Sequence, residues 1–240
     1  MNKRILFRLQ KLVFALTHPT HWRALQEKVA PAIEHQSVLR TLNCDRVIDV
    51  GANRGQFSLV CRRVMPGVPI TAFEPLPSEA AVYQRIHGLV PGVELHSVAL
   101  GERNGRATFH LSRQSDSSSL LPIGSEQIRL FPQTDEVGTL DVTVRCLDDY
   151  IARWALHSHM LLKLDVQGFE LFALRGAIAT LARCSYVYVE CSEVPLYKGQ
   201  ALFPEVADFL ATQGFRLLER ENLQFDGGQL VQSDCLFGRI

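Results

Sequence analysis

The sequence lacks an excess of charge of either sign. Its 240 residues include 25 lysines and arginines and 25 aspartates and glutamates. A chain with no net positive charge creates no overall field that would attract the phosphate backbone of a nucleic acid. We therefore expect no nucleic-acid partner.

The sequence also lacks the paired cysteine spacing that is typical of zinc sites and redox centres. None of its six cysteines belongs to a C-x-x-C motif, and most of them stand beside apolar residues. They are Cys44, Cys61, Cys146, Cys184, Cys191 and Cys235. We interpret them as reduced, buried and structural, which indicates a cytoplasmic protein.

No uninterrupted apolar run reaches the roughly 18 residues that a membrane-spanning helix needs. The N-terminus, MNKRILFRLQKLVFAL, is both basic and apolar, but Arg8 and Lys11 interrupt what would be the apolar stretch of a signal peptide. Two interpretations of residues 1–16 stay open. They form either a helix packed on the domain or an amphipathic helix that touches an anionic membrane, such as the inner membrane surface.

The sequence does contain enough apolar residues, 47% of the chain, for one sizeable core. After a helical extension over residues 1–45, short apolar runs alternate with helix-length amphipathic segments over residues 46–240. This alternation predicts one α/β domain with a doubly wound, mostly parallel sheet. The expected strands are RVIDV (46–50), ITAFE (70–74), VELHSVAL (93–100), MLLKLDV (160–166) and SYVYVE (185–190).

Three segments depart from this alternation. GRATFHL (105–111) predicts an additional strand, and the serine-rich segment 112–125 predicts a long loop over the site. Near the C-terminus, two apolar runs flank a turn at 226–228. We expect a hairpin there, and therefore an antiparallel last strand.

The segment VIDVGANRGQF (47–57) joins an apolar strand to a turn that contains Gly51 and Gly55. In an open parallel sheet, this first strand-to-helix turn is where a ligand binds, and glycine leaves room for it. Asn53 stands where the dinucleotide motif G-x-G-x-x-G has its middle glycine, which argues against a pyrophosphate. Asp49 and Glu74, each at a strand end, suit the charged amino acid part and the ribose of S-adenosylmethionine. An NAD site and a purely structural turn are the alternatives.

Eight ordered motifs cover nearly the whole chain from Val47 onward. They are VIDVGANRGQFS, FEPLP, VALGERNGRATF, SDSSSL, LDDY, LLKLDVQGFELFALRGA, VYVECS and SDCLFGR. In these motifs the sequence resembles the FkbM-type S-adenosylmethionine-dependent methyltransferases. The resemblance implies a class I, Rossmann-like methyltransferase fold and methyl transfer mostly to oxygen, with sugars, polyketide-like products and related small molecules as substrates. The chain departs from many such enzymes at Gln167, where they have glutamate.

The resemblance and the residue chemistry place the same residues at S-adenosylmethionine. Four residues of the first turn are expected close to its methionine part: Gly51, Ala52, Asn53 and Gly55. Asp49 is expected near its ammonium group or an ordered water there, and Glu74 at its ribose.

Two further segments are assigned to the cofactor. Ser97, Val98 and Ala99 are expected to close the third strand against the adenine, with a plain strand end as the alternative. Ser118 lies in a serine cluster that forms either a lid on cofactor or substrate or a solvated loop.

The chemistry is expected at Asp165 and Glu190, which should lie side by side at the carboxyl ends of the fourth and fifth strands. Two acids there can deprotonate a hydroxyl as general base or hold a divalent cation. We favour the base without a metal. A structural ion pair between Asp165 and Lys163 is the alternative. None of the eight histidines falls at a predicted carboxyl end of a strand, so we interpret them as surface or packing residues.

The loops 112–138 and 192–203 are expected to select the substrate. Tyr197, Lys198 and Gln200 offer a ring and hydrogen-bond donors that suit a sugar, although a loop capping the sheet edge explains them equally well. We predict O-methylation of a hydroxyl on a carbohydrate or a natural-product intermediate. The alternatives are a methyltransferase acting on a lipid-linked glycan at the membrane surface, a nicotinamide-dependent oxidoreductase and a non-catalytic nucleotide-binding module. The absence of an N/D-P-P-Y/F motif argues against an enzyme that methylates amino groups of DNA.

Overall fold

The computed structural model describes residue 11, residues 21–154 and residues 159–240. Apart from Lys11, the segment 1–16 for which we considered membrane contact lies outside the described residues. No helix in the described part of the chain combines the length and the apolar character needed to cross a membrane.

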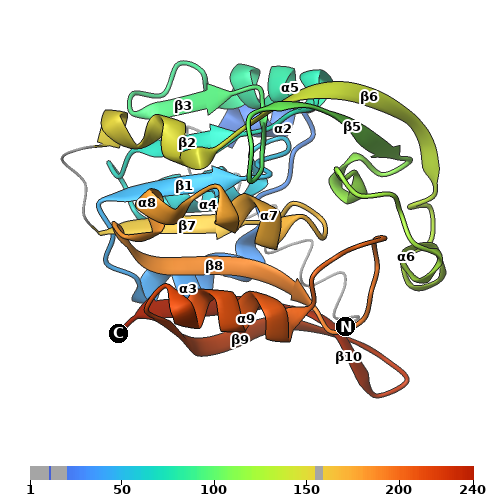
Figure 1. Ribbon diagram of the computed structural model, residues 1–240. Helices are drawn as coiled ribbons and strands as arrows, with labels where there is room; N and C mark the ends of the chain where they lie inside the picture. Colours follow the sequence, from blue (N-terminus) through green and yellow to red (C-terminus); the bar gives the residue numbers. More distant parts are fainter. Residues whose placement is uncertain (1–10, 12–20, 155–158) are drawn as a thin grey trace, which may run out of the picture.

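A seven-stranded sheet forms the centre of the molecule (Figure 1). Its strand order is β3-β2-β1-β7-β8-β10-β9. The bounds are β1 Arg46–Val50, β2 Ile70–Phe73, β3 Val93–His96, β7 Met160–Leu164, β8 Cys184–Ser192, β9 Phe215–Asp226 and β10 Gln229–Arg239. The first five of these strands pair in parallel, and β10 pairs antiparallel with both β8 and β9. The doubly wound sheet and the antiparallel C-terminal strand are therefore confirmed.

The chain leaves β1 in one direction along the sheet to β2 and β3, and later returns to the other side of β1 with β7 and β8. Such a reversal of strand order opens a crevice beyond the carboxyl ends of the strands, where open α/β sheets bind ligands. The sequence of β7, MLLKL, is buried at every position. Such mostly apolar runs are needed because helices cover both faces of a parallel sheet, and the one charged residue of this run, Lys163, is buried as well.

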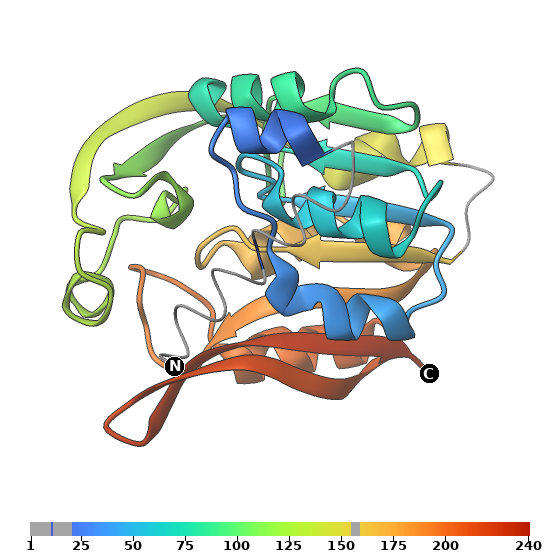
Figure 2. The same cartoon turned by 180° about the vertical axis from the view of Figure 1, so that it is seen from behind.

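Helices cover the two faces in separate groups. On the face in front in Figure 1 lie α7 Glu170–Arg175, α8 Ile178–Leu181 and α9 Phe203–Thr212. On the face in front in Figure 2 lie α2 Trp22–Gln26, α3 Gln36–Thr41, α4 Gln56–Val64 and α5 Pro77–His87. The described part of the chain also contains two 3₁₀ helices outside the second sheet, η2 Ile33–His35 and η4 Leu147–Trp154. One apolar cluster joins α7, α8 and α9 to the sheet, and a second joins α3 and α4 to it, whereas α2 and α5 contribute to smaller clusters.

A second, three-stranded sheet has the order β4-β6-β5. It consists of β4 Ala99–Leu100, β5 Gly105–Ser112 and β6 Glu136–Arg145, and η3 Ser115–Ser117 and α6 Ser125–Leu130 lie between β5 and β6. The predicted extra strand at 105–111 is thus confirmed, whereas β6 was not predicted. Most side chains of β6 are exposed, so the strand lacks the apolar run by which the buried strands were found. In Figure 1 the β5–β6 hairpin curves past the ends of the parallel strands.

Two predicted elements are divided in the structure. The expected strand 93–100 breaks after His96, because β3 pairs with β2 whereas β4 pairs with β6. The expected helix 169–182 is interrupted at Gly176, where a Cβ atom would collide with the carbonyl oxygen of Gly101. Close backbone approach therefore requires glycine at this position.

The six cysteines are all free, and four of them are buried. Cys44 and Cys146 are partly exposed, so the expectation of burial is wrong for these two.

Candidate functional site

A cavity of about 830 Å³ opens at the carboxyl ends of β1, β2 and β7. Its wall includes eight of the residues that we assigned to a site: Gly51, Ala52, Asn53, Glu74, Val98, Ala99, Ser118 and Asp165. Four other assigned residues are not part of the wall: Asp49, Gly55, Ser97 and Glu190. The cavity lies in the size range of small-molecule sites.

The turn after β1 has three residues in the left-handed region: Gly51 at φ 75°, Asn53 at φ 46° and Gly55 at φ 90°. A Cβ atom on Gly51 would collide with the carbonyl oxygen of Asp165, and one on Gly55 would collide with the imidazole of His87. We had expected glycine to leave room for a ligand. In the structure, neighbouring protein atoms leave no space for a Cβ atom at either glycine. Gly51 allows the turn to pack against the residue that follows β7.

Asp49 is completely buried and faces another strand rather than the cavity. It pairs in register with Lys163 on β7, and the two side chains meet at 3.3 Å between Oδ1 and Nζ. Its other oxygen accepts a hydrogen bond of 2.8 Å from the Ser58 hydroxyl. Burial opposes protonation of Lys163, but the carboxylates of Asp49 and Asp165 outweigh it and hold the pKa of Lys163 above its usual range. Asp49 thus anchors Lys163.

Glu74 follows β2 and is only 4% exposed. One carboxylate oxygen accepts the N–H of Asn53 and the other that of Leu76, each at 2.8 Å. Burial raises the pKa of Glu74 to about 7, against the lowering effect of these two hydrogen bonds. Because each carboxylate oxygen has more than one acceptor position, Glu74 can still accept hydrogen bonds from a ligand in the cavity.

An apolar part of the wall lies near Glu74. It is formed by Phe73, Val98, Ala99, Leu100 and Phe169. Val98 lies between β3 and β4, and its N–H donates to the carbonyl of His96. This part of the wall suits a flat aromatic base.

Asp165 and Glu190 come together as expected, but through a third residue. The Gln167 amide donates hydrogen bonds to Asp165 at 2.8 Å and to Glu190 at 3.0 Å. The Asp165 side chain is 41% exposed and lies 3.6 Å from the Nζ of Lys163. Gln167 thus lies between Asp165 and Glu190. The other carboxylate oxygen of Glu190 accepts a hydrogen bond from the amide of Gln232. Burial and the negative charge of Asp165 raise the pKa of Glu190 well above its usual range.

Gln167 also joins the serine-rich segment, residues 112–125, to the site, a role that sequence reasoning missed. The Ser119 hydroxyl donates to the backbone carbonyl of Gln167 at 2.7 Å, and the Tyr197 hydroxyl lies 2.8 Å from its side-chain oxygen. The Ser118 hydroxyl accepts the N–H of Ser112 at 3.0 Å, a hydrogen bond within this segment. The departure from glutamate at 167 was the signal in the sequence that marked this position.

One histidine contradicts the expectation that none falls at the carboxyl end of a strand, and a second, expected to be a surface or packing residue, lies in the cavity wall. His96 is the last residue of β3, although it is not part of the cavity wall. His35, on η2, does form part of the wall. Its place could not be read from strand patterns, because η2 precedes the first strand.

Within residues 11, 21–154 and 159–240, no three His, Cys, Asp or Glu side chains converge as a metal site would require.

Comparison with known proteins identifies the family. Residues 49–217 match the methyltransferase FkbM domain. The 2-O-methyltransferase NoeI of Sinorhizobium fredii is 26% identical over 235 residues, which cover 95% of this chain and 93% of that protein. The 31-O-demethyl-FK506 methyltransferase FkbM of Streptomyces tacrolimicus is 28% identical over 212 residues, 78% of this chain and 79% of that protein. Among solved structures, magnesium protoporphyrin IX methyltransferase of Synechocystis with bound S-adenosylmethionine aligns with a TM-score of 0.47 at 9% identity, over 87% of this chain and 81% of that one.

The cavity fits the cofactor of this family. Glu74 offers carboxylate oxygens to a ribose, and the apolar wall suits an adenine. S-adenosylmethionine supplies the methyl group. The chain has the class I fold of a largely parallel seven-stranded sheet, and it belongs to the FkbM family of S-adenosylmethionine-dependent methyltransferases.

Proposed function

We propose that the protein transfers the methyl group of S-adenosylmethionine to a hydroxyl of a carbohydrate or natural-product intermediate. The observation that carries this proposal is the composition of the cavity wall, which contains polar side chains besides its apolar part. Glu34, His35, Gln56, Arg113 and Ser115 are among them. Side chains of this kind exchange hydrogen bonds with hydroxyl groups. Two relatives point the same way, because their names describe methylation at oxygen.

Asp165 is the proposed partner of the acceptor hydroxyl. Its half-exposed carboxylate belongs to the same cavity as Glu74, so that an acceptor and the methyl donor can meet beside it. Lys163 and Gln167 hold the carboxylate in place from two sides. Orientation of the attacking oxygen toward the methyl group is a large part of what such a site contributes. Glu190 acts through Gln167 and is proposed as a positioning residue.

The test is transfer of a labelled methyl group from S-adenosylmethionine to a panel of methyl glycosides and hydroxylated macrocycles. We expect an alkali-stable methyl ether on one of these classes. The variant Asp165→Asn should lower kcat by about a hundredfold or more, while the dissociation constant of S-adenosylhomocysteine changes by less than about threefold. Asp208→Asn, at an exposed aspartate on α9, is the matched control and should keep full activity. Label that appears on amines alone contradicts the proposal.

A further inference from the structure

His35 is a histidine of the cavity wall with an acid behind it. Its side chain is 16% exposed. The Nδ1 atom lies 3.0 Å from the hydroxyl of Tyr188 and 3.5 Å from a carboxylate oxygen of Asp234. The ring also packs edge-on against Phe57 and Tyr188, with centroids 5.4 and 5.5 Å apart. These contacts fix the orientation of the imidazole.

The other ring nitrogen of His35, Nε2, is therefore the one that can form a hydrogen bond with a ligand in the cavity. No atom in the described part of the chain forms a hydrogen bond with it, and it is not among the fully buried polar atoms that lack a partner. In a neutral imidazole, a nitrogen that carries no hydrogen accepts a proton. The Tyr188 hydroxyl, 3.0 Å from Nδ1, can accept a hydrogen bond from it, and a carboxylate oxygen of Asp234 lies 3.5 Å away. The amide nitrogen of Asn222 lies 3.4 Å from Nδ1, but its shorter contact, 2.7 Å, is with Asp234. A hydrogen on Nδ1 therefore meets acceptors there, and this tautomer leaves Nε2 as the acceptor.

Asp234 belongs to the motif SDCLFGR, to which no role has been assigned so far. It lies on β10, opposite Glu190 on β8. The amide of Asn222 on β9 donates to it at 2.7 Å, and Asn222 adopts a positive φ of 50° at a bulge of that strand. Burial raises the pKa of Asp234, whereas His35 and Asn222 lower it. The carboxylate is thus held by neighbours from two other parts of the chain.

The charged and titratable groups around His35 come from several elements. Asp234 of β10 and Tyr188 of β8 touch the ring directly. On η2 itself, Glu34 forms an ion pair with Lys11 at 3.1 Å. Lys163 and Asp165 of the β7 strand end act on Asp234 from farther away, with opposite signs. Asp234 is the carboxylate that lies in contact with the ring.

We propose that His35 is the proton acceptor of the methyl transfer and that Asp234 is its positioning residue. This inference rests on the proposed O-methylation. As the hydroxyl oxygen forms its bond to the methyl carbon, the carbon–sulfur bond breaks and its electron pair stays on sulfur. The hydroxyl proton moves to Nε2 of His35. The products are a methyl ether, a neutral thioether and an imidazolium next to Asp234, and the imidazolium then returns its proton to water.

His35 suits this role better than Asp165 does. One oxygen of Asp165 accepts from Gln167 and the other faces the ammonium group of Lys163. Both oxygens of Asp165 therefore already have a partner within the protein. Imidazole is the side chain whose protonation lies nearest neutral pH, which is the most effective range for a general base. Asp165 then orients the hydroxyl whose proton His35 removes.

The first test needs no acceptor substrate. Diethyl pyrocarbonate acylates unprotonated imidazoles, and peptide mass spectrometry identifies the histidines that have reacted. We expect His35 to react at least about tenfold faster than His87, which is fully buried. In Asp234→Asn, the pH at which His35 becomes reactive should move lower, because the imidazolium loses its carboxylate. Reaction of His35 no faster than that of His87, or an unchanged pH midpoint in Asp234→Asn, overturns the proposal.

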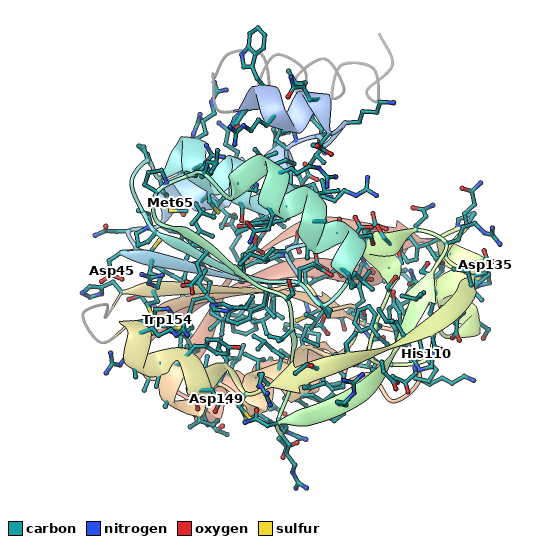
Figure 3. The ribbon with its side chains drawn as sticks, turned by 90° about the horizontal axis from the view of Figure 1, so that it is seen from above. Asp45, Met65, His110, Asp135, Asp149 and Trp154 are labelled. Carbon is teal, nitrogen blue, oxygen red and sulfur yellow. The ribbon has the colours of Figure 1, made fainter. Side chains whose placement is uncertain are left out.

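The second test uses any glycoside that the wild type methylates. His35→Gln should lower kcat about a hundredfold or more and remove the acidic limb of the pH–rate profile, with S-adenosylhomocysteine affinity unchanged within about threefold. Asp234→Asn should shift that limb to lower pH. His110→Gln is the matched control, because His110 is 18% exposed and lies 3.0 Å from Glu136. Figure 3 shows His110 on the β5–β6 side of the molecule, and it is not part of the cavity wall.

The outcomes separate this inference from the proposed function. Wild-type turnover in His35→Gln overturns the role of His35, and so does a loss of S-adenosylhomocysteine affinity of about tenfold or more, which would make His35 a cofactor ligand. If the wild type methylates no hydroxyl at all, the proposed function fails. His35 is then judged by the acylation experiment alone, and fast, Asp234-dependent reaction supports a basic imidazole in the cavity.

Discussion

The carboxyl group of Glu74 loses its proton near neutral pH, because burial raises its pKa to about 7. Ribose hydroxyls donate hydrogen bonds, so S-adenosylhomocysteine should prefer the ionised carboxylate. Below pH 7 binding must first remove a proton, and the affinity should fall by up to about tenfold for each pH unit. Isothermal titration at pH 7 in buffers of different ionisation enthalpy should therefore detect proton release on binding, and Glu74→Gln should abolish it.

Glu170 offers a matched control for this prediction. It is also buried, and burial raises its pKa to about 7, but it is not part of the cavity wall. One of its oxygens accepts the N–H groups of Val166 and Gly168, bonds that a glutamine can keep. Glu170→Gln should therefore retain the proton release. Equal release in wild type and Glu74→Gln would show that Glu74 does not meet the ribose.

At the scale of single elements, the turn after β7 depends on the chemical type of Gln167. Its amide is the donor shared by Asp165 and Glu190. Gln167→Glu replaces this donor with a third carboxylate, so two acceptors lose their partner and three negative charges meet. We expect a loss of about 1 to 3 kcal/mol in the free energy of unfolding at pH 8. The loss should be smaller at pH 5, where carboxyl groups with raised pKa values are protonated.

Thermal unfolding at both pH values measures this difference. Gln200→Glu is the control, because the amide of Gln200 donates to the hydroxyl of Ser192 rather than to a carboxylate. It should show little dependence on pH. A loss in Gln167→Glu that is the same at pH 5 and pH 8 would mean that packing, and not charge, explains the glutamine.

Elements differed in how well the sequence predicted them, for a physical reason. β1, β2, β7 and β8 are buried on both faces, so their apolar runs are unmistakable. The end of β3 was not predicted, because the sequence pattern of a strand continues through residues 93–100. In the structure, β3 pairs with β2, whereas β4 pairs with β6. Which strand a residue pairs with depends on distant segments, and no local pattern contains that information.

At the scale of the whole molecule, the cavity lies between segments that the fold brings together, so its ligand should stabilise the entire domain. S-adenosylhomocysteine at 100 times its dissociation constant should add about 2.7 kcal/mol to the free energy of unfolding. For a chain of this length, that corresponds to a rise in Tm of about 5 to 11 °C. NAD at the same concentration should leave Tm unchanged. A rise with NAD but none with S-adenosylhomocysteine would contradict the assignment of the cavity.

By itself the sequence determined the class of the fold, the position of the first turn and the acids at the ends of the strands. These features follow from local periodicity, from glycine and from the order of apolar runs, all of which a linear pattern contains. Only the tertiary structure decided what each acid faces. Asp49 forms an ion pair with Lys163, and Glu190 accepts a hydrogen bond from Gln167. His35 contacts Tyr188, which lies 153 positions away in the chain. Such contacts arise when strands and loops from distant parts of the chain pack together. The partners of a buried polar group depend on this three-dimensional packing and not on the order of residues in the sequence.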